Sequence, residues 1–262
     1  MNKNTIIGLV LIFGIFIGYS YLMSPSQDQL LNQKRKADSI YMAAQAKRVS
    51  DIKALARERA VAIAREQEKV LASGKKIDSA TLVRLTLKDE LGLFAHAAVG
   101  KDTSFLIEND VFKLQVASLG GKISRVELKD YLTWDQRPLV LASKDSLQFG
   151  FSFFSNNRII NTNKLYFQPF WPDARMEGQS HIKVSGSDSV RFGMRLFMAA
   201  SDTTADPNKY IEYIYTVRAS ENMLRYSVKF VNMSDVVDPA TKFLVLNCNC
   251  NLARLEKSLN ME

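Results

Sequence analysis

The side chains best suited to chemistry are few in this chain of 262 residues, and they lie far apart in the sequence. Cys248 and Cys250 are two positions apart in a run typical of a strand, where alternation places both thiols on one face. A metal site would need further cysteine or histidine partners, and the two histidines, His96 and His181, are distant. A disulfide between the cysteines would close a tight ring against strand geometry. We therefore predict two free thiols and no metal site.

No catalytic constellation is visible in the sequence. General acid–base catalysis needs titratable groups brought together, and nucleophilic catalysis needs a Ser, Cys or Lys beside a base. The chain has no GxSxG, HExxH or P-loop motif, and no GxGxxG in a useful context. Carboxylates that only folding could pair are Glu127, Asp130, Asp135, Glu177 and Glu212. We predict no catalytic residue, no cofactor and a protein that is not an enzyme.

A transmembrane segment is predicted from Thr5 to Met23, nineteen residues without a charged side chain. As a helix this segment would be about 28 Å long, close to the roughly 30 Å hydrocarbon thickness of a bilayer. A cleaved signal peptide is the alternative, but bulky Tyr and Leu residues interrupt the small residues that a cleavage site needs. We favour an uncleaved anchor in contact with the lipid bilayer. Gly14 and Gly18 form a GxxxG pair that would allow another helix to pack closely.

A charged helical tether is predicted to follow the anchor. The segment 27–76 holds twelve basic and six acidic residues, which accounts for six of the eight net positive charges. It has no glycine or proline before Gly74, and its Ala-, Lys-, Arg- and Glu-rich composition favours a helix. The rest of the protein is nearly neutral, so we predict no nucleic-acid partner. A solvated spacer is the preferred interpretation, and contact with lipid headgroups near 34–36 is the alternative.

The remainder is predicted to be an antiparallel β-sandwich. We divide the chain into an anchor (1–26), the tether (27–76), a transition segment with weak alternation over 81–87 (77–102) and the β-domain (103–262). Val190, Phe192, Met194, Leu196 and Met198 alternate with other residues, as in a half-buried strand. Further alternating runs begin at Leu147, Ile211 and Leu224, with polar turns between them. A hairpin is predicted around Gly120 and Gly121, since glycine tolerates positive φ angles. The aromatic cluster over 149–171 is expected to be core.

The arrangement resembles a known family over nearly the whole chain. The anchor and helical tether lead into a run over 108–129 that reads ENDVFKLQVASLGGKISRVELK. Later runs read KYIEYIY at 209–215 and KFVNM at 229–233. Together these segments resemble the N-terminal portion of the bacterial YidC membrane protein insertases, in their Bacteroidetes form.

The resemblance implies a function and a topology. Proteins of this family insert and fold inner-membrane proteins, alone or with the Sec translocon. The implied partners are therefore nascent membrane proteins and that translocon, and the implied location is the bacterial inner membrane. The first helix would run from the cytoplasm outward, which places the domain in the periplasm. The domain would be a β-supersandwich similar to sugar mutarotases in fold, without their chemistry.

The chain also departs from the family pattern. The insertase core of the family is a bundle of five further helices, and no apolar run after Met23 is long enough to span a bilayer. We therefore expect an incomplete sandwich and no insertase activity from this chain alone. A membrane-tethered module that binds carbohydrate or protein is the second interpretation. A mutarotase-type enzyme is the third, and it would need His181 and a carboxylate to converge on one sheet face. The sequence leaves client proteins and oligomeric state open.

Overall fold

The computed structural model describes residues 12–14, 19, 27–72, 79–144, 146–201, 204–239, 241 and 244–251. Within this part, no helix combines the length and the apolar character needed to cross a membrane. Most of the predicted anchor, Thr5 to Met23, lies outside the described residues, and so does Gly18. The anchor and the GxxxG packing therefore stay predictions.

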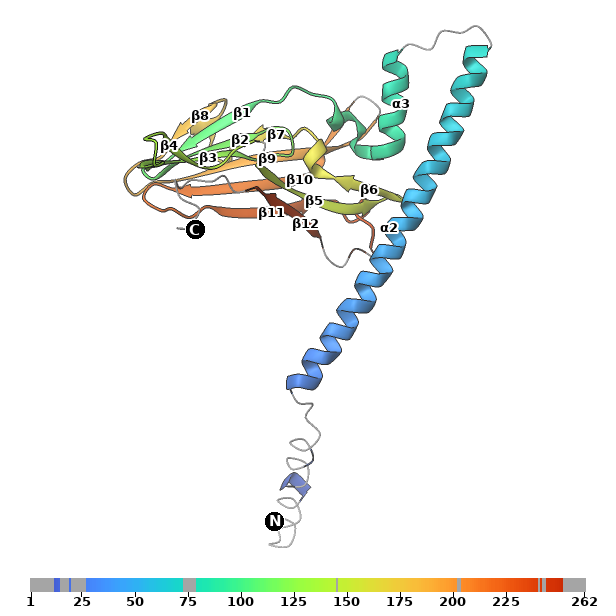
Figure 1. The fold of residues 1–262 in the computed structure, drawn as a ribbon, viewed down its shortest axis with the longest axis horizontal. Helices are drawn as coiled ribbons and strands as arrows, with labels where there is room; N and C mark the ends of the chain where they lie inside the picture. The colour runs from blue at the N-terminus through green and yellow to red at the C-terminus, as the bar shows by residue number, and fades with distance from the viewer. Residues whose placement is uncertain are drawn as a thin grey trace, which may run out of the picture. The chain divides into compact units, whose positions relative to one another are not determined.

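The chain divides into two compact units, 1–53 and 54–262. A single helix, α2 (Gln27–Ala72), contains most of the described residues of the first unit and continues into the second (Figure 1). Its residues are strong helix formers, and glycine and proline are absent from its length. The helical character predicted for 27–72 is confirmed.

A second helix corrects the prediction for the transition segment. Helix α3 (Ser79–Leu91) covers residues 81–87, where weak alternation was expected, and the 3₁₀ helix η1 (Gly92–Ala98) follows it. Val83, Leu87 and Leu91 are spaced by four residues and therefore share one helix face, which ends in the buried Leu91. Gly92, with φ of +56°, breaks the helix. The weak alternation over 81–87 did not indicate a strand, because in so short a segment the apolar residues of a helix face can alternate in the same way.

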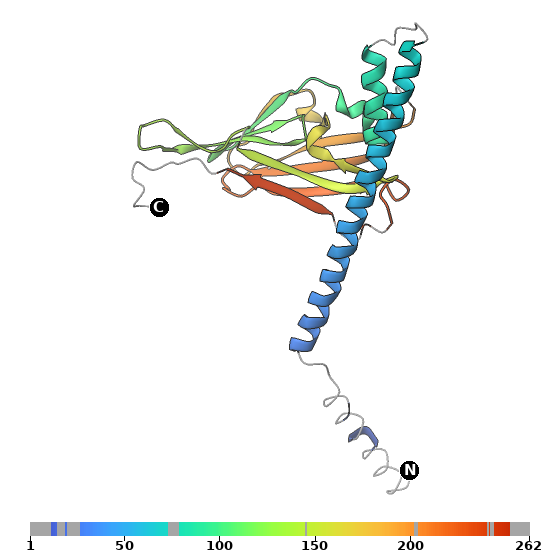
Figure 2. The ribbon, with the colours of Figure 1, turned by 45° about the vertical axis from the view of Figure 1, so that its right-hand side comes forward.

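Three sheets form the β-domain, as Figures 1 and 2 show. The first sheet has the order β4-β3-β2-β1-β8, the second β11-β10-β9-β7 and the third β12-β5-β6. Strands β1 and β8 pair in parallel, and the other pairs are antiparallel. The bounds are β1 Ser104–Glu108, β2 Phe112–Ala117, β3 Lys122–Leu132, β4 Pro138–Ala142, β5 Leu147–Ser155, β6 Arg158–Asn161, β7 Gln168–Phe170, β8 His181–Lys183, β9 Ser189–Ala199, β10 Ala205–Arg218, β11 Arg225–Val231 and β12 Val245–Cys250. The short 3₁₀ turn η2 (Thr162–Lys164) lies between β6 and β7, and η3 (Ala174–Met176) lies between β7 and β8. The prediction of a mainly antiparallel β-domain is confirmed.

The core takes buried side chains from all three sheets and includes the predicted inward residues. All five alternating residues of β9, from Val190 to Met198, are buried. Tyr213 and Tyr215 of β10 are fully buried and pack among aromatic rings such as Phe167, whose centroid is 4.6 Å from that of Tyr213. Phe94 of η1 packs edge-on against Phe153. The η1 segment is therefore part of the same core. In the aromatic cluster over 149–171, Phe153 and Phe167 are buried, and Phe151 and Trp171 are partly buried and pack against the core, so the core prediction is confirmed for these four residues.

The predicted glycine hairpin joins β2 to β3. Gly120 and Gly121 have φ of +81° and +57°, in the left-handed region. Phe167 lies so close to Gly121 that a Cβ there would meet its ring at 2.7 Å. Gly121 is thus required for its φ angle and for its lack of a side chain.

Replacing Gly121 with alanine should destabilise the domain by about 3 kcal/mol, because backbone strain adds to a clash with a buried ring. Gly178 is the matched control, since its φ is +77° but nothing lies within 4 Å of its Cβ position. Gly178→Ala should cost only about 1 kcal/mol. Urea unfolding followed by tryptophan fluorescence measures both values, and equal losses would show that the contact with Phe167 is unimportant.

Candidate functional site

A histidine and a carboxylate meet on the first sheet. Glu108 of β1 accepts hydrogen bonds from Lys129 Nζ at 2.8 Å and lies 3.1 Å from His181 Nε2 of β8. Lys129 Nζ also donates to the backbone oxygen of Asn109 at 2.8 Å. The hydrogen bond from Lys129, together with that from His181, lowers the pKa of Glu108 from 4.5 to about 2.

This cluster is poorly suited to general-base catalysis. A carboxylate with so low a pKa holds its charge firmly and takes up a proton weakly near neutral pH. Its oxygens are engaged by Lys129 and His181, so it serves as an electrostatic clamp between β1, β3 and β8. The convergence that a mutarotase-type enzyme requires is present, but the charge state favours a structural role.

Three of the five carboxylates that the sequence analysis named are paired with cations. Glu127 binds Lys113 and Arg125 at 3.1 and 2.9 Å, and Asp135 contacts Arg137. Glu212 binds Arg195 at 2.6 Å. The guanidinium of Arg195 also lies 3.4 Å above the ring of Phe170. We therefore assign a structural role, through these ion pairs, to Glu127, Asp135 and Glu212.

Both cysteines lie on a strand, as the sequence predicted. Cys248 and Cys250 are free, exposed and part of β12. Strand β12 is an edge strand paired with β5, and all six of its residues are exposed. No group of three or more metal-ligating side chains occurs within the described part of the chain.

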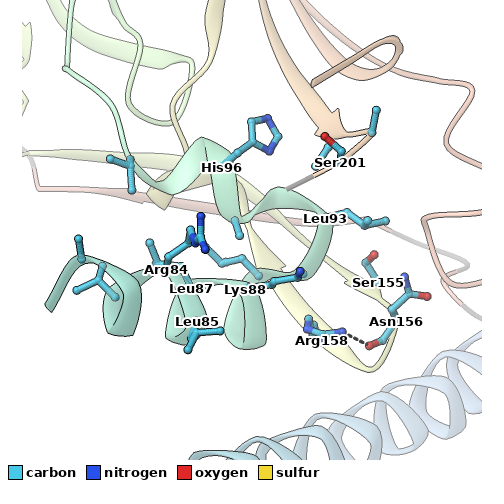
Figure 3. A pocket seen from close by; sticks show the side chains of 18 of the residues that line it. Arg84, Leu85, Leu87, Lys88, Leu93, His96, Ser155, Asn156, Arg158 and Ser201 are labelled. Atoms are coloured by element: carbon cyan, nitrogen blue, oxygen red, sulfur yellow. Dashed lines mark hydrogen bonds between the residues drawn. The ribbon is translucent and has the colours of Figure 1, made fainter. Parts of the chain in front are cut away.

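A cavity of about 950 Å³ opens where α3 and η1 meet the turns between β5 and β6 and between β9 and β10 (Figure 3). Arg84 and Lys88 of α3 and Arg158 of β6 bring three positive charges to its wall. Arg158 is held in place because its Nε donates to the backbone oxygen of Asp89 at 2.6 Å and its Nη1 to that of Asn156 at 3.0 Å. The larger aliphatic side chains of the wall are those of Val83, Leu85, Leu87, Leu91, Leu93 and Val99.

His96 of η1 also lines this cavity. Partial burial lowers the pKa of its imidazole, so the ring is neutral at pH 7. Its Nδ1 atom is buried without a hydrogen-bond partner among the described residues. The cavity therefore combines a neutral imidazole, three cationic side chains and an aliphatic surface, and the described residues that line it include no carboxylate.

Sequence reasoning missed this cavity. Arg84 and Lys88 are four residues apart and share a helix face, which is a detectable signal once 79–91 is recognised as a helix. Arg158 offers no such signal, since 69 residues separate it from Asp89, to which it binds.

Known proteins resemble the chain over its whole length. It is 27% identical over 262 residues to the membrane protein insertase YidC of Bacteroides fragilis, and 28% identical over 263 residues to that of Parabacteroides distasonis. These alignments cover all of this chain but only 35% and 37% of the relatives. The chain resembles the YidC insertases in their N-terminal portion. The resemblance inferred from sequence is thereby confirmed.

The YidC relatives are longer proteins. The chain spans about a third of the length of the relatives it matches. A further YidC, from Amoebophilus asiaticus, is 29% identical over 153 residues, or 58% of this chain. No protein-family profile matches the sequence. The relatives are named for insertion of membrane proteins, a function distinct from classical enzyme catalysis.

The Glu108 clamp predicts a dependence of stability on pH. The pKa of Glu108 is lower in the folded state, so its contribution is fully present above about pH 4.5 and is lost as pH falls towards 2. Glu108→Gln should cost about 1–2 kcal/mol at pH 7 and nearly nothing at pH 2. Urea unfolding at several pH values measures the difference.

Glu221→Gln is the matched control, because Glu221 forms a more exposed ion pair with Arg218. Its effect should stay within about 0.5 kcal/mol at every pH. A loss for Glu108→Gln that is independent of pH would contradict the clamp.

Proposed function

We propose that this chain acts in the insertion of membrane proteins, as the N-terminal part of a YidC-type insertase. The supporting observation is its similarity to YidC proteins along all of its length. In this proposal Thr5 to Met23 anchors the chain in the inner membrane, with its N-terminus in the cytoplasm. Helix α2 then acts as the tether, and the β-domain lies in the periplasm. Nascent membrane proteins and the Sec translocon are the proposed partners.

The proposed division of labour assigns anchoring and positioning to these 262 residues. The sequence offers one apolar segment of membrane-spanning length, Thr5 to Met23. A single helix provides no enclosed groove through which a client helix could enter the bilayer. The 262 residues alone are therefore proposed to lack insertase activity.

Complementation of a Bacteroides strain depleted of its own YidC tests this division. The chain alone should not restore growth. A chimaera in which it replaces the corresponding N-terminal third of the Bacteroides fragilis YidC should restore growth. Unmodified Bacteroides fragilis YidC is the positive control, and immunoblotting confirms that each protein is made. Rescue by the chain alone, or failure of a well-expressed chimaera, would refute the proposal.

The proposed orientation can be tested through the two native cysteines. Cys248 and Cys250 are exposed and are the only cysteines of the chain. A membrane-impermeant maleimide added to reduced, intact spheroplasts should label them if the β-domain is periplasmic. The variant Cys248→Ser/Cys250→Ser should give no signal. Labelling that appears only after the membrane is permeabilised would place the domain in the cytoplasm.

A membrane-tethered binding module is the second candidate, and the cavity beside α3 favours it. Its volume lies within the range of small-molecule sites. Its larger side chains are aliphatic and basic, and the lining residues that the structure describes include no phenylalanine, tyrosine or tryptophan. Carbohydrate binding usually exploits aromatic faces, so this cavity does not favour a sugar.

A further inference from the structure

The hairpin between β3 and β4 presents large apolar side chains to solvent. Tyr131, Leu132 and Trp134 follow one another closely in the sequence, and they are 58%, 55% and 56% exposed. Strand β3 pairs with β2 from Lys122 to Leu128, so the end of the hairpin continues past β2 as a two-stranded ribbon. Figure 2 shows this ribbon projecting from the first sheet. We call residues 129–138 the hairpin tip.

The turn of the hairpin tip satisfies much of its own hydrogen bonding. The N–H of Thr133 donates to the backbone oxygen of Arg137 at 2.8 Å, and the N–H of Gln136 donates to that of Thr133 at 2.9 Å. The N–H of Arg137 donates to Thr133 Oγ1 at 3.2 Å, and its Nε donates to Asp135 at 2.6 Å. Polar groups that are already paired lose less free energy when the water around them is replaced by a less polar medium. The tip therefore leaves bulk water at a low cost.

The residue types of the tip fit the boundary between the headgroups and the acyl chains of a bilayer. Tryptophan and tyrosine combine an apolar ring with one polar group, and both are enriched at membrane interfaces. Leu132 adds an aliphatic side chain that gains free energy when it leaves water. Lys129 and Asp130 are exposed where the tip joins the sheet, a position at which charged groups keep their contact with water and headgroups.

The shape of the tip favours a bilayer over a protein as the occupant. A stable complex between two proteins buries about 800 Å² on each partner, which requires a broad face. The tip instead offers three large side chains at the end of a narrow ribbon. A fluid layer surrounds such a ribbon on all sides and needs no matching surface.

We propose that the hairpin tip inserts Tyr131, Leu132 and Trp134 into the interface of a phospholipid bilayer. The inference rests on the proposed function in one respect, since the anchor from Thr5 to Met23 would hold the β-domain near a membrane. A tethered contact acts at a high effective concentration, so the small apolar surface of the tip is sufficient.

Quenching of tryptophan fluorescence tests the proposal, because Trp134 and Trp171 are the only tryptophans of the chain. The full chain is reconstituted into phosphatidylcholine vesicles, with or without bromine atoms on the upper part of the acyl chains. In the variant Trp171→Phe, brominated lipid should lower the emission of Trp134 about twofold, since a side chain that enters the interface by about 5–10 Å meets the bromine atoms. Trp134→Phe is the matched control, and the emission of its Trp171, which packs against the core, should change little.

A charge placed in the tip gives a second test. Leu132→Asp in the Trp171→Phe background should remove most of the quenching, because a carboxylate opposes entry into the bilayer. Met223→Asp is its matched control, since Met223 is 70% exposed in the turn between β10 and β11, and it should leave the quenching unchanged. Circular dichroism confirms that each variant is folded.

Flotation of the same vesicles on a density gradient separates this proposal from the proposed anchor. A chain that floats while Trp134 and Trp171 are quenched equally would retain the anchor and overturn the insertion of the tip. Equal effects of Leu132→Asp and Met223→Asp would overturn it as well. A chain that fails to float would contradict the anchor, and the tethered contact of the tip would fall with it.

Discussion

The β-domain depends on the complete burial of two tyrosines on β10. Tyr213 and Tyr215 have no exposed surface, so their hydroxyl groups must find partners inside the protein. Tyr215 donates to the backbone oxygen of Gly121 at 2.6 Å, and Tyr213 to Thr162 Oγ1 at 3.1 Å. Each bond joins the second sheet to a different part of the domain, the β2–β3 hairpin in one case and η2 in the other. Burial raises the pKa of both phenols, so they stay neutral donors. The sheets are therefore held at positions that satisfy both hydroxyls.

This constraint explains which parts of the fold could be predicted from sequence. Strands β9 and β10 are buried along one face over their central residues, so their side-chain period was unmistakable. The hairpin at 120–121 could also be predicted from its glycine pair, because it needs positive φ angles. Helix α3 was missed because Leu85 and Leu87 alternate in the same short run where Val83, Leu87 and Leu91 form a helical stripe. A seven-residue window cannot separate the two periods, and only the length of the element decides between them.

The functional residues were harder to predict for a different physical reason. Glu108 and His181 meet because β8 pairs in parallel with β1. A pairing between segments so far apart in the sequence cannot be detected from local periodicity. The contact of Arg158 with the carbonyl of Asp89 is likewise made by tertiary packing. From the sequence, His181 and five carboxylates were named as candidates but Glu108 was not, and folding decided which of these groups meet. Glu127, Asp135 and Glu212 all became partners of nearby cations.

The domain has two charged regions, the Glu108 cluster and the cavity wall at α3, and their charged side chains are bound in different ways. On the first sheet the negative charge of Glu108 is neutralised by Lys129 within the protein, so the cluster has little capacity to attract a ligand. At α3, Arg84, Lys88 and Arg158 line the cavity beside aliphatic side chains, and Arg158 donates hydrogen bonds to the backbone oxygens of Asp89 and Asn156. The cations at α3 thus differ from those around Glu108, whose carboxylate binds Lys129 and His181 and so connects three strands of the first sheet.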